Sequence, residues 1–374
     1  MVEGLSPSRS VNSSTVQTGL RAVQVTPRIA ADASEFRVVL AAELQSVQSV
    51  CVVLNPAVRH IFRGLVAPAL PPGVRLSVRA EDRFGPVPEV DMLLAVGGGS
   101  TMDLAKGLAG PTATPWCGIL TKPSAAAFSA SISLRPGGLV TSRFGPLPQA
   151  VIAPLHVLLD SPPSLLTAEL LDTWSYQTAA VDLLLSADGR GDAIDEYRDL
   201  FNAATAALEP ITTAGPMTAH SVARLVEVQA ALCATINESR STRYVSGVEH
   251  MVAHALAAAG SDAMHGSAVG LGILVGRVLQ EHPAVRSAVF AGDAGLRTLS
   301  QEQLLQLRAL TWHTMTPAQR DLVTDLLPKA VLVAHRIRDK PRFSVLDMVD
   351  DAVKLQAVQT ILTGWTSQTG GISR

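Results

Sequence analysis

The chain of 374 residues carries 30 Lys and Arg side chains against 32 Asp and Glu, which gives a formal net charge of −2. No basic block stands out that could follow a phosphate backbone, and this argues against nucleic acid as a partner. The three cysteines, Cys51, Cys117 and Cys233, are an odd number without CxxC spacing, so they support neither a disulfide framework nor a thiolate metal site. These features predict a protein of the reducing cytoplasm.

Residues 1–18 are polar and rich in serine, and we expect them to be flexible. They lack the uninterrupted apolar run of a secretory signal, and no stretch of about 18 apolar residues predicts a membrane span elsewhere. The remaining length is enough for two domains of ordinary size, each with its own hydrophobic core.

Short apolar runs alternate with a helical pattern in the first half of the chain. The runs end in turn signals, as buried strands do, and residues 57–70 between two of them have apolar side chains at helical spacing. Strands and helices in alternation build a parallel sheet, so we predict an α/β domain with a Rossmann-like parallel sheet over residues 19–160. The predicted strands are 21–25, 49–55, 90–98 and 149–157.

The second half of the chain changes character at the break Asp160–Ser164. From there on, apolar residues recur at helical spacing, and we predict an all-α domain over residues 161–374. The clearest helical segments are 165–185, 217–236, 248–260 and 267–280.

Three consecutive glycines, Gly97–Gly99, follow the third predicted strand and precede a helix. Glycine lets a ligand approach main-chain N–H groups, and the helix N-terminus favours an anion, so this turn and Ser100 are predicted to hold a cofactor pyrophosphate. Asp103 would lie one turn inside the helix, facing the cleft, and is a candidate catalytic residue. The alternative is a plain tight turn, because the glycines match neither GxGxxG nor GxxxxGK[ST]. Asn55 ends the second strand as a candidate ribose contact, or as a turn or helix cap.

Histidines gather near residue 250. His250 and His254 lie four residues apart on one face of a predicted helix, and His265 begins the next one. Imidazole is the commonest nitrogen ligand of zinc, and a catalytic site needs three protein ligands with one open position. A carboxylate would complete the set, either Asp172 among apolar neighbours or Asp182. For each histidine alone, a structural or exposed role is the alternative.

Two motifs together give the chain a family resemblance. The GGGSxxDxAK turn at 97–106 and the SGxEHxxxHAL helix at 246–256, followed by His265-Gly266, resemble the dehydroquinate synthase-like and iron-containing alcohol dehydrogenase superfamily. Residues 242–256 are similar to the SRPxSGxEHxxSHAL stretch of glycerol-1-phosphate dehydrogenases, and 341–346 are similar to the RYTIL ending of that branch. The resemblance covers about residues 50 to 350.

The resemblance implies NAD or NADP and a divalent metal, usually zinc with iron as the alternative, in a cleft between two domains of a homo-oligomer. Asp172, His250 and His265 match the metal ligands of the family. His254 matches a histidine that relays a proton beside the substrate, and Arg243 matches an arginine that binds an anionic substrate. The implied cofactor contacts are Asn55, Gly97, Gly98, Gly99, Ser100, Thr121 and Ser124.

Some positions depart from the family pattern. The Asp-Gly pair of the branch is replaced by Pro123-Ser124, and the GxGD motif that ends on the metal carboxylate begins here with Glu169. Tyr176 stands where the family has Lys or Asn, and Ser267 stands where it has Glu. We expect these departures to face the substrate.

The leading functional hypothesis is reversible hydride transfer between NAD(P)H and a small phosphorylated ketone. One alternative is a sugar-phosphate cyclase, a lyase that uses NAD transiently. The other is a non-catalytic relative with a decayed substrate pocket.

Overall fold

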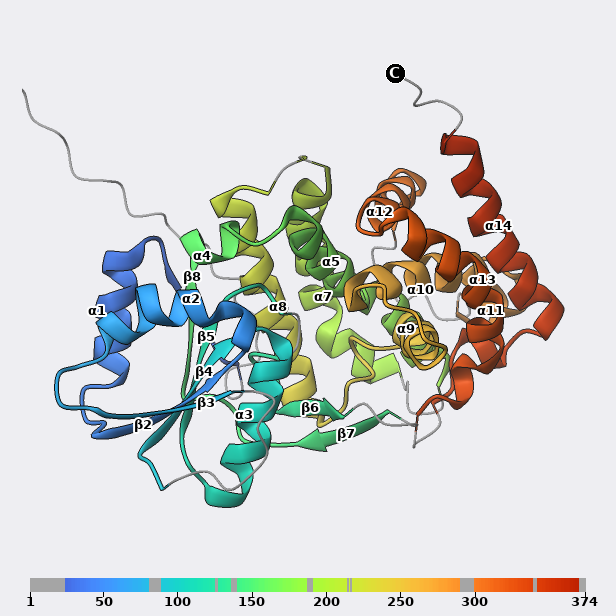
Figure 1. Ribbon diagram of the computed structural model, residues 1–374. Helices are drawn as coiled ribbons and strands as arrows, with labels where there is room; N and C mark the ends of the chain where they lie inside the picture. Colours follow the sequence, from blue (N-terminus) through green and yellow to red (C-terminus); the bar gives the residue numbers. More distant parts are fainter. Residues whose placement is uncertain are drawn as a thin grey trace, which may run out of the picture.

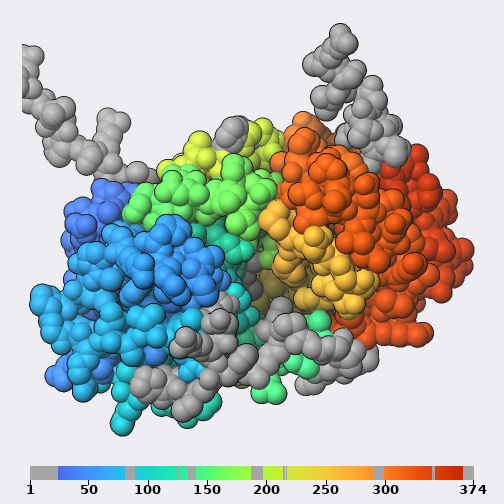
Figure 2. Space-filling view, viewed as in Figure 1, coloured from blue at the N-terminus to red at the C-terminus, as the bar shows by residue number. Residues whose placement is uncertain are grey.

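The computed structural model describes residues 24–80, 89–124, 127–135, 140–186, 191–213, 215, 217–289, 299–338 and 342–369. The predicted flexible segment 1–18 lies outside them. A sheet with flanking helices forms one half of the molecule, and a helical bundle forms the other (Figure 1). In the space-filling view the two halves are lobes that meet in the middle (Figure 2). None of the described helices is long and apolar enough to cross a bilayer.

Six parallel strands form the sheet, in the spatial order β1-β8-β5-β4-β2-β3. Every residue of β2, β4, β5 and β8 is buried, as expected for parallel strands that helices cover on both faces. The strands are β1 (Arg28–Ala30), β2 (Ser49–Leu54), β3 (Arg75–Ala80), β4 (Met92–Gly97), β5 (Trp116–Leu120) and β8 (Ala150–Pro154).

Different helices cover the two faces of the sheet. Helix α1 (Ala33–Glu43) packs Phe36 and Leu40 on one face, together with short turns between residues 56 and 69. Helices α3 (Gly99–Thr112), α4 (Leu155–Leu159) and α8 (Ala219–Ser239) pack on the other face. The α/β domain with a parallel sheet is thereby confirmed.

The predicted strands 49–55, 90–98 and 149–157 are confirmed as β2, β4 and β8. The prediction at 21–25 is wrong for its described part, because Gln24 and Val25 are irregular and the first strand begins at Arg28. Residues 57–70 form a series of short helical turns rather than one helix, since prolines at both ends remove the backbone donors of a regular helix.

A two-stranded hairpin reaches from the sheet half toward the helical half (Figure 1). Its strands β6 (Ile132–Arg135) and β7 (Thr141–Phe144) are antiparallel. Val140, at the start of β7, donates its backbone N–H to the carbonyl of Ile337 at 3.0 Å and forms a bridge with Arg338. The hairpin therefore connects the two halves through main-chain contacts.

The helical half surrounds one large apolar cluster, and the all-α prediction is confirmed in the described residues. The predicted boundary near residue 160 remains a prediction, and it falls in the link between α4 and α5. The segment 165–185 forms two helices rather than one. The helices are α5 (Pro163–Thr173), α6 (Tyr176–Leu185), α7 (Gly191–Thr213), α9 (Val248–Ala258), α10 (His265–Gln280), α11 (Pro283–Val289), α12 (Gln301–His313), α13 (Pro317–Val333) and α14 (Asp351–Thr369).

Helix α10 packs unusually close to α9 and α5 because glycines lie at the contacts. A Cβ atom at Gly272 would overlap the backbone of Glu249, and one at Gly266 would overlap the carbonyl of Ala168. Since α9 carries His250 and α10 begins at His265, this close packing sets the distance between the two imidazoles.

The substitution Gly272→Ala is expected to lower the free energy of unfolding by about 1–3 kcal/mol, since the added methyl forces α9 and α10 apart. The measurement is the apparent melting temperature. Gly64→Ala is the matched control, because a Cβ there meets nothing within 4 Å. Equal melting temperatures for the two variants would contradict the close-packing argument.

Candidate active site

A cavity of about 530 Å³ lies where the two halves meet. On the sheet side its lining follows the carboxyl ends of three adjacent strands, with Asn55 after β2, Gly98 after β4 and Thr121 after β5. On the helical side it is lined by residues of α5, α8, α9 and α10. Ligands of parallel α/β sheets bind at this edge, and the volume is that of a small-molecule site.

The glycine turn begins helix α3 at the sheet side of the cavity. Gly98, Gly99 and Ser100 line the cavity, whereas Gly97 is not among its lining residues. A Cβ at Gly97 would overlap the side chain of Thr101, so this glycine is needed for packing. The turn thus leaves the first amides of α3 beside the cavity, which is the geometry that anion binding requires.

Three other predicted cofactor contacts, Asn55, Thr121 and Ser124, also line the cavity. Asn55 caps the turn that follows β2, because its Oδ1 accepts a hydrogen bond from the N–H of Ala57 at 2.9 Å. Its side-chain amide therefore serves the capping role that was the alternative to ribose binding. The cofactor contacts remain predictions.

Asp103 lines the cavity and forms an ion pair with Lys106, with 2.8 Å between Oδ1 and Nζ. Lys106 is only 1% exposed and also donates to the carbonyl of Ile132. Burial lowers the pKa of Lys106, and the neighbouring carboxylate of Asp103 opposes that shift. This geometry gives Asp103 a charge-balancing role and offers no support for the predicted catalytic one.

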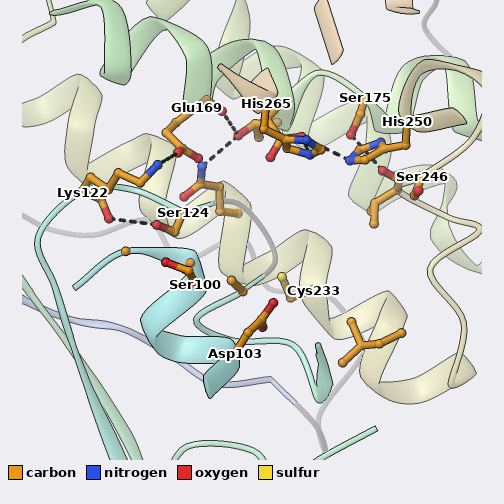
Figure 3. A pocket seen from close by; sticks show the side chains of 18 of the residues that line it. Ser100, Asp103, Lys122, Ser124, Glu169, Ser175, Cys233, Ser246, His250 and His265 are labelled. Carbon is orange, nitrogen blue, oxygen red and sulfur yellow. Dashed lines mark hydrogen bonds and ion pairs between the residues drawn. The ribbon is translucent and has the colours of Figure 1, made fainter. Parts of the chain in front are cut away.

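Asp172, His250 and His265 come together from α5, α9 and α10, and their ligand atoms all lie within 4.8 Å of one another (Figure 3). The Nε2 atoms of His250 and His265 are 3.3 and 3.7 Å from Asp172 Oδ1. That oxygen is buried and accepts no hydrogen bond from the described residues. Burial alone would raise the pKa of Asp172, but the imidazoles of His265 and His250 outweigh it and hold the pKa below its usual value.

The donor set fits a divalent metal. One carboxylate and two imidazoles are ligands for catalytic zinc and for non-haem iron, and three protein ligands leave positions open. All three residues line the cavity, so an open position would face a substrate there.

Asp182, the rival carboxylate, lies elsewhere. Its oxygens accept the backbone N–H groups of Val248 and Val345, and it is absent from the cavity lining. Burial raises its pKa well above the usual value, and the carboxylate of Glu249 adds to the shift. The geometry therefore favours Asp172 as the carboxylate ligand.

Glu249 is a functional residue that the sequence analysis did not single out. It is fully buried, and its Oε1 lies 3.0 Å from Nδ1 of His250. Its Oε2 accepts a hydrogen bond from Thr178 Oγ1 at 2.6 Å. A carboxylate on Nδ1 favours the tautomer that leaves the Nε2 lone pair facing Asp172. The carboxylate of Glu249 therefore orients the His250 ring.

His254 lies beside the cluster, with its ring centroid 6.0 Å from that of His250 and 5.6 Å from that of His265. It is not among the cavity-lining residues, and its Nε2 is buried without a hydrogen-bond partner in the described part of the chain. Burial, followed by repulsion from the two neighbouring histidines, lowers its pKa to about 2. His254 is therefore neutral at physiological pH.

Arg243 does not line the cavity, and its predicted contact with an anionic substrate stays a prediction. It lines a second, much smaller pocket with Asp182 and Arg342. The reason is local, because the neighbouring Thr242 lines the cavity, Arg243 lines the other pocket, and Ser246 lies between the two and lines both. The arginine that lines the cavity is Arg338.

Two of the expected substrate-facing departures are core residues. Tyr176 is 1% exposed, stacks on Phe201 and shares a hydrogen bond with Thr205. Ser267 is fully buried and donates a hydrogen bond to Thr314. Neither lines the cavity, nor does Pro123.

Glu169, like Ser124, is a departure that faces the cavity. It forms an ion pair with Lys122, with 2.5 Å between Oε1 and Nζ, and both residues line the cavity (Figure 3). Lys122 follows β5 in the sheet half and Glu169 lies on α5 in the helical half. This pair therefore joins the two halves at the cavity wall.

The substitution Glu249→Gln is expected to weaken zinc binding about 10–100-fold, because the neutral amide no longer fixes the His250 tautomer. The measurement is a competition titration of the apo-protein with a coloured zinc chelator. Glu281→Gln, at a half-exposed residue of the helical half, is the control. Unchanged zinc affinity in Glu249→Gln would show that this carboxylate does not orient a ligand.

The chain matches no protein-family model. Solved structures of the same fold include glycerol dehydrogenase from Schizosaccharomyces pombe, with a TM-score of 0.61, 18% identity and coverage of 94% of both chains. An iron-containing alcohol dehydrogenase from Corynebacterium glutamicum has a TM-score of 0.60 and 18% identity, over 90% of this chain and 95% of that one. The fold is therefore the dehydroquinate synthase-like fold of iron-containing alcohol dehydrogenases.

Curated relatives indicate which family of this fold the chain belongs to. Glycerol-1-phosphate dehydrogenase [NAD(P)+] from Methanosphaerula palustris is 30% identical over 265 residues, which are 69% of this chain and 68% of the relative. The enzyme of that name from Thermococcus sibiricus is 30% identical over 190 residues, 50% of this chain and 54% of the relative. The chain belongs to the glycerol-1-phosphate dehydrogenase family of NAD(P)-dependent oxidoreductases.

Proposed function

We propose that the chain catalyses reversible hydride transfer between NAD(P)H and a small phosphorylated ketone. The observation that carries the proposal is that the glycine turn and the Asp172–His250–His265 cluster line one cavity (Figure 3). The names of the relatives indicate dihydroxyacetone phosphate as the ketone to test first. Ketone, NAD(P)H and one proton give the alcohol and NAD(P)⁺.

Different residues of the chain would bind the cofactor and the metal. The first amides of α3, at Gly99 and Ser100, would hold the cofactor pyrophosphate. Asp172, His250 and His265 would hold a divalent metal, zinc or iron. When bound, the metal supplies a Lewis acid for the carbonyl oxygen, and the nicotinamide supplies the hydride.

His254 is suited to moving the proton. A neutral imidazole carries one N–H and one lone pair, so it can accept a proton at one ring nitrogen and release one at the other. Its low pKa keeps it in this neutral form, so it would pass a proton on without holding it. Its ring lies next to those of His250 and His265, which supports the proposed relay.

The test is an assay of NADH and NADPH oxidation with dihydroxyacetone phosphate, after loading the apo-protein with zinc or with ferrous iron. Net oxidation of one cofactor at steady state is expected. Substrate turnover without net oxidation of NADH or NADPH would indicate a cyclase and would overturn the proposal. So would the absence of oxidation in protein that contains stoichiometric metal and binds the cofactor.

The substitution His250→Ala is expected to lower the metal content from about one ion per chain to near zero, because two ligands do not hold a catalytic metal. Elemental analysis of the purified protein measures the content. His60→Ala, at an exposed residue of the sheet half, should keep its metal. Full metal content in His250→Ala would sink the ligand assignment.

A further inference from the structure

The end of the cavity beyond His250 has a polar character of its own. Ser175, Thr242 and Ser246 line it together with Arg338. In the close-up view, Ser175 and Ser246 lie beside His250 (Figure 3). Ser100 lies away from them in the same view, in α3 on the sheet side of the cavity. The imidazole cluster thus lies between the glycine turn and this second group of hydroxyls.

Arg338 brings a permanent positive charge to this end. It is only 6% exposed, and its Nη2 donates a hydrogen bond to Ser246 Oγ at 2.7 Å. It lines the same cavity as Asp172, His250 and His265. Guanidinium stays ionised in proteins, and a buried charge is costly unless an anion or polar groups compensate it.

Contacts within the protein hold both Arg338 and the residues that carry the neighbouring hydroxyls. The bridge from Val140 holds the main chain of Arg338 against the hairpin of the sheet half. Arg342 donates to the carbonyl of Ser246 at 3.1 Å and to Thr242 Oγ1 at 2.6 Å, which holds the residues 242–246 that carry the hydroxyls. Contacts within the protein therefore hold both the guanidinium and the hydroxyls.

The lysine and the arginine of the cavity lie at different ends of it. Among the described residues that line it, Lys122 and Arg338 are the lysine and arginine side chains. Lys122 lies next to the glycine turn, where a Cβ on Gly98 would touch it, and it is paired with Glu169. Arg338 lies at the other end, among hydroxyls.

We propose that Arg338, with the hydroxyls of Thr242 and Ser246, is the subsite for the phosphate of the substrate; this deepens the proposed function and rests on it. The guanidinium fork matches two phosphate oxygens, and the hydroxyls supply further donors. A phosphate anchored here directs the carbonyl of a three-carbon ketone toward His250 and His265. It also leaves the glycine turn to the cofactor.

The main test compares Arg338→Met with Arg338→Lys. Arg338→Met is expected to lower kcat/KM for dihydroxyacetone phosphate by at least about 30-fold, mostly through KM, because it removes a buried cationic partner of the anion. Arg338→Lys should recover part of the loss, since it keeps the charge without the fork. Metal content and NADPH affinity should stay at the wild-type level in both.

Arg277→Met is the matched control, because Arg277 lies on α10, pairs with Glu281 and lines no cavity. It should keep the kcat/KM of the wild type. Arg243→Met tests the competing assignment. A large rise in KM for Arg243→Met, with none for Arg338→Met, would overturn the proposal.

A binding measurement separates this inference from the reaction itself. Inorganic phosphate is titrated into the metal-loaded protein by calorimetry, with Arg338→Met in parallel. Loss of phosphate binding in the variant is expected even if dihydroxyacetone phosphate is not reduced, in which case only the proposed reaction fails. Equal binding by both proteins would overturn the subsite. If Arg338→Met does not fold, Arg338→Lys and Ser246→Ala replace it. Wild-type phosphate affinity in both of these variants would likewise overturn the subsite.

Discussion

The close approach of α10 to α9 and α5 is the constraint on which the candidate site depends. Gly266 and Gly272 allow backbones to touch where any side chain would separate them. Because of this, the first residue of α10, His265, reaches the same carboxylate as His250 on α9. Larger side chains at these contacts would push the helices apart and separate the three groups. The site is therefore a product of helix packing as much as of ligand choice.

Buried charge is balanced in a different way at each acidic group around the site. Asp172 is ionised next to two imidazoles, whereas Asp182 is surrounded by backbone donors and has a raised pKa. Glu249 is satisfied by Thr178 and by His250. Of these carboxylates, Asp172 has the buried oxygen that accepts no hydrogen bond from the described residues, and it is the one that lines the cavity. This contrast distinguishes a ligand from a structural carboxylate by its surroundings.

Much of the fold could be predicted because its central strands are continuous apolar runs and its helices have clear periodicity. The segments 49–55 and 90–98 are of this kind, while β3 was missed because its arginines give an edge strand a polar pattern. The buried strand β5 was missed as well, although its residues are apolar. The contacts within the site were harder to predict from the sequence. The contact between Glu249 and His250 joins adjacent residues, which do not share a helix face, so spacing could not reveal it. Arg243 and Arg338 are 95 positions apart, and sequence spacing could not show that Arg338 lines the cavity while Arg243 lines the smaller pocket.

The ion pair between Lys122 and Glu169 links cohesion of the two halves to the ionic environment. One partner comes from the sheet half and the other from the helical half, and the lysine side chain is 31% exposed. Dissolved salt weakens a partly exposed pair more than a buried one, so rising ionic strength weakens this link between the two halves. The contact between the halves at the cavity wall therefore has an electrostatic component that depends on the surrounding solution.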